Sequence, residues 1–159
     1  MGASEDVNQE IMSALRDNLG ETLEEYLLPP PVFRTMEGEF VAFDPEAGVL
    51  KARFPVRNRY LNPYHAMQGG MVAAAVDNTL GPLSVLVAPP NVTRRLTMTY
   101  SRPVTLDLEY ILVTASLEEQ NGRRLSFRAD VRDRAGNRLA RAKAEHWILE
   151  EQESSAPGT

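Results

Sequence analysis

The chain contains no cysteine and only two histidines among its 159 residues. The lack of cysteine excludes disulfide bonds, a thiol nucleophile and a thiolate metal site. The two histidines, His65 and His146, lie too far apart in the sequence to form a local metal-binding motif. We therefore expect no metal and no bound cofactor, and any chemistry must use other side chains or the backbone.

Positive charge is also scarce, since 17 lysines and arginines face 22 aspartates and glutamates and the net charge is −5. This balance argues against nucleic acid as a partner, because phosphate binding needs clustered positive charge. Residues 1–6 are polar and acidic and lack the order of a signal peptide. The apolar run 71–87 is near the length of a membrane span, but Asp77 and Asn78 interrupt it. We expect a cytoplasmic protein with no membrane partner.

Length and composition indicate one soluble domain with additions at both ends. Residues 9–28 carry isoleucine and leucine at four-residue steps, which predicts an amphipathic helix, and three prolines at 29–31 end it. We divide the chain into an N-terminal helix with a proline-rich connection (1–31), a main domain (32–149) and a tail (150–159). The tail is rich in Glu, Ser, Pro and Gly, so we expect it to be disordered.

Six segments have strand character. Residues 40–43 and 49–54 flank a turn-rich segment, which predicts a hairpin. Four longer segments alternate with a period of two, and they span 92–101, 110–117, 124–132 and 139–148. Asn121-Gly122 is a strong hairpin signal, so neighbouring strands should be antiparallel. In the first long strand we expect Val92, Leu96 and Met98 to share an apolar face that only Arg94 interrupts.

The main domain is organised around a predicted helix of about twenty residues at 68–87. Large apolar side chains gather on one side of it, namely Val72, Val76, Leu80, Leu83 and Val87. Small residues gather on the opposite side together with Asp77, namely Gly70, Ala73, Ala74, Gly81 and Ser84. The bulky side should pack on the sheet, which defines an α+β fold with a curved antiparallel sheet wrapped around one long helix. We expect the small side to face a partner subunit.

The helix carries two features that can support chemistry. Gly69 and Gly70 leave backbone amides at its positive end, which can hold a phosphate or stabilise a carbonyl oxygen that becomes negative. Alternatively, the glycines only allow a tight entry into the helix. Asp77 is a candidate base, or else a surface carboxylate with local partners. It lies roughly 10 Å along the axis from Gly70, so the two can meet only across a dimer interface.

These residues resemble a known family. The pattern Asn62-x5-Gln68-Gly69-Gly70-x6-Asp77-Asn78, followed by Thr97-x-Thr99-Tyr100-Ser101-Arg102-Pro103-Val104, is similar to the hotdog-fold acyl-CoA thioesterases. The similarity is to the branch related to the phenylacetate-pathway thioesterase, and it covers about residues 38–149. It implies hydrolysis of an acyl-CoA thioester by a homodimer or homotetramer, with coenzyme A entering as part of the substrate.

The resemblance also implies roles for individual residues. Asp77 would be the general base or nucleophile, Gly69 and its neighbouring amides would polarise the carbonyl, Asn62 would orient the carbonyl or leaving group, and Thr93 would position water. The family's usual histidine is Gln68 here, which can donate a hydrogen bond but cannot transfer a proton near neutral pH. Gly70 and Asn78 are further candidates for binding the substrate. Met71, Leu83 and residues 57–67 are candidates for lining the acyl pocket. The candidates for the phosphates are Arg94, Arg95, Arg102, Arg123 and Arg124.

Two other functions are compatible with the sequence. A non-catalytic module of the same fold would bind acyl-CoA or support assembly, with Gln68 marking lost chemistry. A hotdog hydratase or dehydratase fits less well, because those enzymes pair a catalytic histidine with a carboxylate and neither motif position has a histidine. His65 is interpreted as part of a loop and His146 as a core or interface residue.

Overall fold

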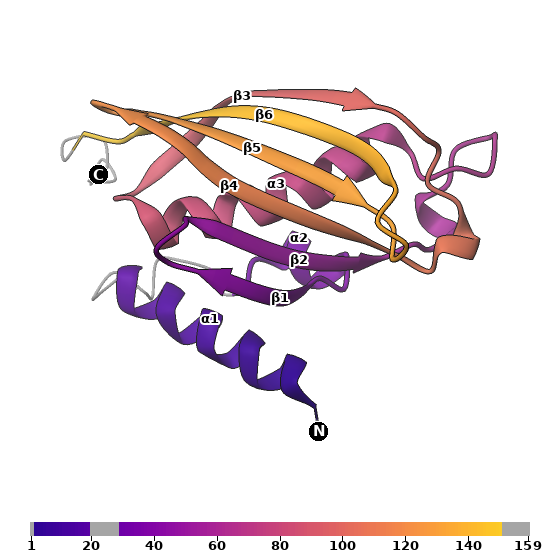
Figure 1. Ribbon diagram of the computed structural model, residues 1–159, viewed down its shortest axis with the longest axis horizontal. Coiled ribbons are helices and arrows are strands. Elements are labelled where there is room, and N and C mark those ends of the chain that lie inside the picture. Colours follow the sequence, from indigo (N-terminus) through magenta and orange to yellow (C-terminus); the bar gives the residue numbers. More distant parts are fainter. Residues whose placement is uncertain (1, 20–28, 151–159) are drawn as a thin grey trace, which may run out of the picture.

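The computed structural model describes residues 2–19 and 29–150, with no side chains described at positions 3 and 4. One antiparallel sheet of six strands curves around one long helix, and a further helix lies beside them (Figure 1). The helices are α1 (Ala3–Leu19), α2 (Pro31–Thr35) and α3 (Gly69–Val87), with short 3-10 turns at η2 (Asn58–Tyr60) and η3 (Leu106–Leu108). The strands are β1 (Glu39–Asp44), β2 (Val49–Pro55), β3 (Asn91–Tyr100), β4 (Tyr110–Asn121), β5 (Arg124–Arg132) and β6 (Arg138–Ile148).

The strand order is β1-β2-β4-β5-β6-β3, and every neighbouring pair is antiparallel. The predicted hairpins are confirmed, including the Asn121-Gly122 turn, where Gly122 has a positive φ of 61°. Strand β3 follows α3 in the chain but pairs only with β6, so β3 forms one edge of the sheet and β1 forms the other.

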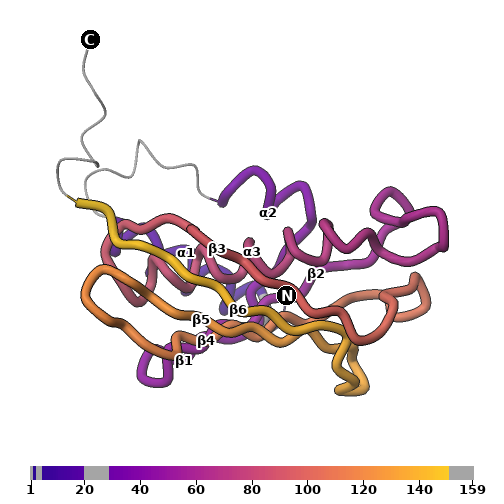
Figure 2. Tube along the Cα trace, turned by 90° about the horizontal axis from the view of Figure 1, so that it is seen from above, coloured from indigo at the N-terminus to yellow at the C-terminus, as the bar shows by residue number. Residues whose placement is uncertain are grey.

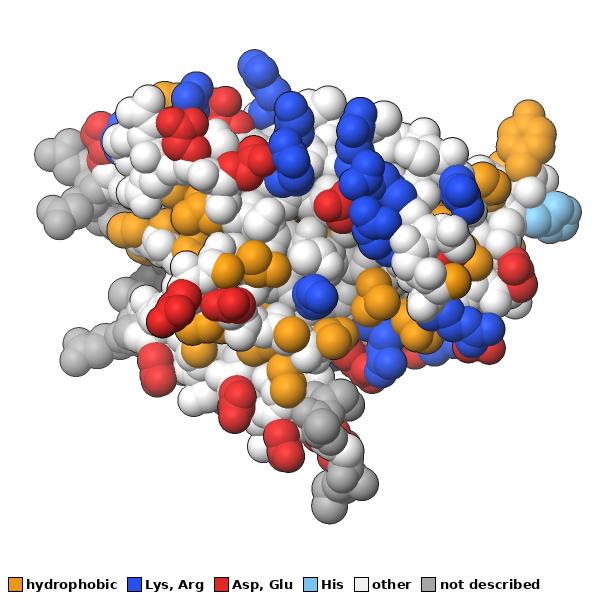
Figure 3. Space-filling model, in the orientation of Figure 1, with side chains coloured by type: hydrophobic (Ala, Val, Ile, Leu, Met, Phe, Trp, Pro, Cys, Tyr) orange, Lys and Arg blue, Asp and Glu red, His pale blue; other side chains and the backbone are white. Residues whose placement is uncertain are grey.

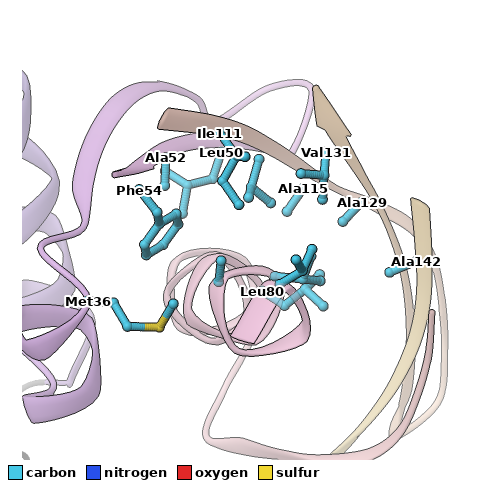
Figure 4. Close-up of a cluster of buried hydrophobic side chains, with 14 of the residues drawn as sticks. Met36, Leu50, Ala52, Phe54, Leu80, Ile111, Ala115, Ala129, Val131 and Ala142 are labelled. Carbon is cyan, nitrogen blue, oxygen red and sulfur yellow. The ribbon is translucent and has the colours of Figure 1, made fainter. Parts of the chain in front are cut away.

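Helix α3 lies in the concave side of the sheet (Figures 2 and 4), as the sequence predicted. Val72, Val76, Leu80 and Leu83 are fully buried, while sheet residues such as Phe54 point at the helix. Burial of each such side chain contributes roughly 1.5–3 kcal/mol. Among the described helices, α3 alone is long and apolar enough to span a membrane, but here it is the core helix of the sheet.

The N-terminal helix differs from its predicted bounds. It starts at Ala3, six residues earlier than expected, and its described part ends at Leu19; residues 20–28 lie outside the described chain. Ile11 and Leu15 are buried in the same core as α3, so the helix is part of the domain's packing. Pro31, the last residue of the proline run, occupies the first turn of α2, where its missing amide costs nothing.

Strand β3 contains a bulge that the alternation did not predict. Thr93 pairs with His146 and Arg95 pairs with Glu145, so Arg94 is an extra residue without a partner across the ladder. A bulge shifts the phase of the side chains by one residue. Thr93, rather than Val92, therefore shares the helix-facing side with Leu96, and Val92 is 39% exposed. The expected placement of Val92 on the apolar face is wrong for this reason.

Candidate functional site

Asp77 lies on the exposed side of α3, in the middle of the helix. An ionised carboxylate is costly to bury without partners, so its position on the surface of a single chain is physically reasonable. It has a hydrogen-bond partner on the sheet, since Oγ1 of Thr93 lies 3.4 Å from Oδ1 of Asp77. The bulge at Arg94 makes this contact possible, because it turns Thr93 toward the helix.

Thr93 also contacts His146 on the adjacent strand, with 3.3 Å between Oγ1 and Nε2. His146 is 1% exposed, and its other ring nitrogen, Nδ1, lies 2.8 Å from Oδ1 of Asn91. The Asn91 amide group donates to the carbonyl oxygens of Ser84 and Pro89, which leaves Oδ1 to accept from the histidine. Nδ1 of His146 therefore carries the hydrogen, and in the neutral ring Nε2 is an acceptor.

Burial lowers the pKa of His146 below its ordinary value, while the negative charge of Asp77 acts in the opposite direction. The neutral ring is thus favoured, and it can accept the single hydroxyl hydrogen of Thr93. The same hydrogen can also be donated to Oδ1 of Asp77, so the carboxylate and the ring share one hydroxyl donor, and the lone pairs of the Thr93 oxygen stay free to accept. Asp77, Thr93, His146 and Asn91 form one hydrogen-bonded group, which we call the Asp77 cluster.

A second candidate group lies at the start of α3, around the backbone amides of Gly69 and Gly70. Met71 and Val72 donate their amides to the carbonyl oxygen of Gln68, but within the described chain no backbone bond is donated by the amides of Gly69 and Gly70. Those two amides stand at the positive end of the helix dipole. The Gln68 side chain is exposed and does not cap the helix.

Tyr100 limits the space for a side chain at position 69. Its hydroxyl donates a hydrogen bond to the carbonyl oxygen of Gly69. A Cβ atom added at Gly69 would lie 3.2 Å from the hydroxyl oxygen and from Cζ of that ring, which is closer than ordinary van der Waals contact. Desolvation raises the pKa of Tyr100, so its hydroxyl stays a donor over a wide pH range. Tyr100 came from the resemblance motif without a role, and the structure gives it one.

Asn62 shapes the loop that leads to α3. Its Oδ1 accepts hydrogen bonds from the amides of Tyr64 and Ala66, at 2.9 and 3.2 Å. The loop then joins the helix start, because the amide of Gln68 donates to the carbonyl oxygen of Tyr60 at 2.7 Å. Only the amide group of Asn62 is left to donate to a substrate. His65 is exposed in this loop, with a φ of 63°.

Within one chain, Asp77 and the amides of Gly69 and Gly70 are too far apart to contact the same atom. Asp77 is seven positions after Gly70, and at about 1.5 Å per residue the two lie roughly 10 Å apart along α3. The sequence prediction that the base and the amides are separated agrees with the observed helix, which is continuous over Gly69–Val87.

The predicted phosphate-binding arginines are not brought together. Arg95 lies on the outer face of the sheet near Lys143 and Glu118, opposite to the side of Thr93. Arg102 follows the far end of β3, where its charge acts on Asp133. Arg94 is exposed at the bulge. Figure 3 shows basic side chains gathered over this outer face of the sheet.

Of the remaining candidates, Asn78 lies beside Asp77 and Met71 lies at the helix start. Leu83 and Arg123 lie away from both. Asn78 donates to the carbonyl oxygen of Ala74 and is half-buried beside Asp77. Met71 is half-buried at the helix start, whereas Leu83 is fully buried on the sheet side, away from both groups. Arg123 is engaged with Glu150 and with the carbonyl oxygen of Ile148. Within residues 2–19 and 29–150 no group of three His, Asp or Glu side chains could hold a metal ion.

Sequence reasoning missed His146 as a member of this site. The alternation correctly placed it on the alanine-rich face of β6, where Ala140, Ala142 and Ala144 are buried. Its partner Thr93 was assigned to the opposite face of β3 because strict alternation ignores the bulge. The two adjacent arginines at 94 and 95, inside an otherwise alternating strand, were the available signal.

Comparison with solved structures identifies the architecture as the hotdog fold. A phenylacetic acid degradation-related protein from Ralstonia eutropha JMP134 is 24% identical, with a TM-score of 0.71 over 80% of this chain and 97% of that one. The E. coli PaaI protein from the phenylacetic acid degradation operon is 13% identical, with a TM-score of 0.72 over 88% and 96%. A hypothetical thioesterase protein from Streptococcus pneumoniae TIGR4, in complex with coenzyme A, is 17% identical, with a TM-score of 0.65 over 70% and 85%.

No protein-family model matches the chain, and no curated protein does. At these identities the structural likeness establishes the fold, and the chemistry has to be argued from the residues.

Proposed function

We propose that the protein hydrolyses an acyl-CoA thioester to a free acid and coenzyme A. The observation that carries this proposal is the Asp77 cluster, in which an exposed carboxylate lies 3.4 Å from a hydroxyl whose hydrogen His146 can accept. The likeness to a thioesterase protein in complex with coenzyme A supports the substrate class.

In the proposed reaction, Asp77 takes one proton from a water molecule, and the oxygen of Thr93 accepts a hydrogen bond from the other. The water oxygen bonds to the thioester carbon, and the carbonyl oxygen becomes negative. The amides of Gly69 and Gly70 stabilise that charge at the helix N-terminus. The oxyanion then re-forms the carbonyl as the carbon–sulfur bond breaks, and the coenzyme A thiolate takes up the proton that Asp77 removed from the water, which restores the carboxylate.

The separation of about 10 Å between Asp77 and the glycine pair requires two chains. We propose a homodimer, or a homotetramer built from dimers, in which Asp77 of one subunit serves the helix start of its partner. Two features support this assembly: the small-residue side of α3 is exposed around Gly70 and Asp77, and β3 is an edge strand of ten residues. Exposed edge strands readily pair with another chain.

Thiol release from purified protein tests the proposal on benzoyl-, phenylacetyl-, short-chain and long-chain CoA esters. Asp77→Asn keeps the shape and removes the base, so we expect kcat/KM to fall by about a hundredfold or more. Asp17→Asn, at an exposed position of α1, is the matched control and should leave turnover as it is. If Asp77→Asn turns over the esters as fast as the wild type does, the proposed role of Asp77 is refuted.

One observation favours a second function, a non-catalytic module that binds acyl-CoA. Gln68 stands where thioesterases resembling this chain have a histidine, and its amide cannot exchange a proton near neutral pH. A protein of this kind would bind acyl-CoA esters tightly and release no thiol from any of them, so the same assay separates the two functions.

A further inference from the structure

A cavity opens beside Asp77 between helices α1 and α3. Its volume is about 310 Å³, and it is bounded by Asp77, Gly81, Val85 and Leu15, with His146 and Asn91 at its base. It lies toward the C-terminal half of α3, on the other side of Asp77 from Met71 and the loop at 57–67. The sequence-based prediction for the acyl lining is Met71, Leu83 and that loop.

Helix α1 is held firmly enough to serve as a wall. Near its end, the amide group of Asn18 lies 3.3 and 3.1 Å from the carbonyl oxygens of Val85 and Leu86 in the last turn of α3. Near its start, Asn8 exchanges two hydrogen bonds with the backbone of Phe40 in β1. Between these points Leu15 is 1% exposed. Both ends of α1 are therefore tied to the domain by side chains that satisfy backbone groups.

The lining identifies the chemistry of the occupant. Among the described lining residues no lysine or arginine is present, and the one carboxylate, Asp77, stands with the Asp77 cluster. His146 favours its neutral form, so the cavity offers no positive charge to a carboxylate or phosphate. Leucine, valine and proline side chains make up most of the remaining surface. A neutral, apolar group fits these walls, and a charged group does not.

We propose that this cavity receives the acyl group of the thioester and that α1 sets the length of acyl chain the protein accepts. The inference rests on the proposed function, because Asp77 at the edge of the cavity would place the thioester carbon there. A volume of about 310 Å³ is at the small end of ligand pockets, which span roughly 300–1,000 Å³. Compact acyl groups are therefore accommodated, and long chains are excluded by α1.

Gly81 gives the sharpest test, because a Cβ atom added there meets no atom within 4 Å. Gly81→Leu adds bulk to the cavity. Gly81→Ala is the conservative control, which shows whether the helix tolerates any side chain at this position. Leu19→Ala enlarges the cavity from the α1 side. Ser13→Leu, at an exposed position of α1, adds the same bulk outside the cavity and is the control.

Affinity for acetyl-, butanoyl-, octanoyl- and hexadecanoyl-CoA is measured by calorimetry in the Asp77→Asn background, and thiol release is measured in the wild-type background. We expect Gly81→Leu to reduce the preference for octanoyl over acetyl by at least about tenfold, the scale of removing pocket space for a few methylene groups. Leu19→Ala should shift the preference toward longer chains, and Ser13→Leu should not change it.

An equal loss of affinity for all four esters in Gly81→Leu would overturn the inference. The same holds if the protein with Gly81 intact binds all four esters with an affinity that does not depend on acyl length. A wild-type protein that releases no thiol from any ester would refute the proposed hydrolysis instead, while the binding series would still decide where the acyl group lies.

Discussion

Oγ1 of Thr93 lies 3.4 Å from Oδ1 of Asp77, although the two residues belong to different layers of the fold. Asp77 is fixed by α3 and Thr93 by the edge strand β3. The contact therefore depends on how the bulge and the loop between α3 and β3 place the strand. This contact joins the carboxylate of α3 to a hydroxyl of the sheet.

Thr93 can be tested by separating its shape from its hydroxyl. Thr93→Val keeps the volume and removes the oxygen, and we expect kcat for thiol release to fall by about ten- to a hundredfold as water loses its position. Thr93→Ser keeps the oxygen and should stay within a few-fold of the wild type. Equal activity of the valine and wild-type proteins would exclude a role for the hydroxyl.

His146 predicts a pH dependence of stability. Its pKa is lowered in the folded protein by burial, so between that lowered value and about 6.5 the unfolded chain binds a proton that the folded chain does not. The free energy of unfolding should therefore rise with pH up to about 6.5 and level off above it.

Urea unfolding of the wild type and of His146→Gln between pH 5 and 8 measures this contribution as the difference between their slopes. His65→Gln, in an exposed loop, should keep the wild-type slope. Parallel curves for the wild type and His146→Gln would contradict the assignment of a buried neutral ring.

The composite site can be tested by mixing subunits. Gly69→Pro removes an amide at the first helical position, where proline is tolerated, and Gly69→Ala adds a comparable Cβ while keeping the amide. We expect each single variant, Asp77→Asn or Gly69→Pro, to have reduced thiol release on its own. After unfolding and refolding together, mixed dimers should contain one intact site and recover up to about a quarter of wild-type activity.

No recovery on mixing, with dimers shown by light scattering, would contradict the composite site. Gly69→Ala separates the loss of the amide from the crowding of Tyr100, since both variants place an atom near that ring. If Gly69→Ala is as inactive as Gly69→Pro, the crowding and not the amide is responsible.

Much of the fold could be predicted from the sequence, because its elements are specified locally. The period-two alternation and the Asn121-Gly122 turn fix the strands, and the angular sorting of Val72, Val76 and Leu80 against the small residues fixes the helix face. The site was predictable only in part. Asp77 and the glycine pair stand within one helix, so their spacing can be counted.

His146 and Thr93 could not be joined in the same way, because their contact depends on pairing between strands 53 residues apart. The placement of the arginines failed for a related reason. Arginines that are close along the chain are separated along β3, since Arg95 lies on the outer face of the sheet in the middle of the strand and Arg102 lies beyond its end, where its charge acts on Asp133.

The bulge at Arg94 has a consequence for anyone aligning or redesigning this strand. Arg94 is the extra residue, so the side chain that meets Asp77 depends on whether the strand keeps its bulge. Deleting Arg94 would restore strict alternation from Leu96 through Arg95 to Thr93, and Thr93 would still face the helix. Keeping Arg94 in a regular strand would instead turn Thr93 to the outer surface and put Arg94 on the helix-facing side. A sequence alignment with a strand that has no bulge therefore needs a one-residue gap at Arg94, because without that gap Thr93 is matched to an outward-facing position.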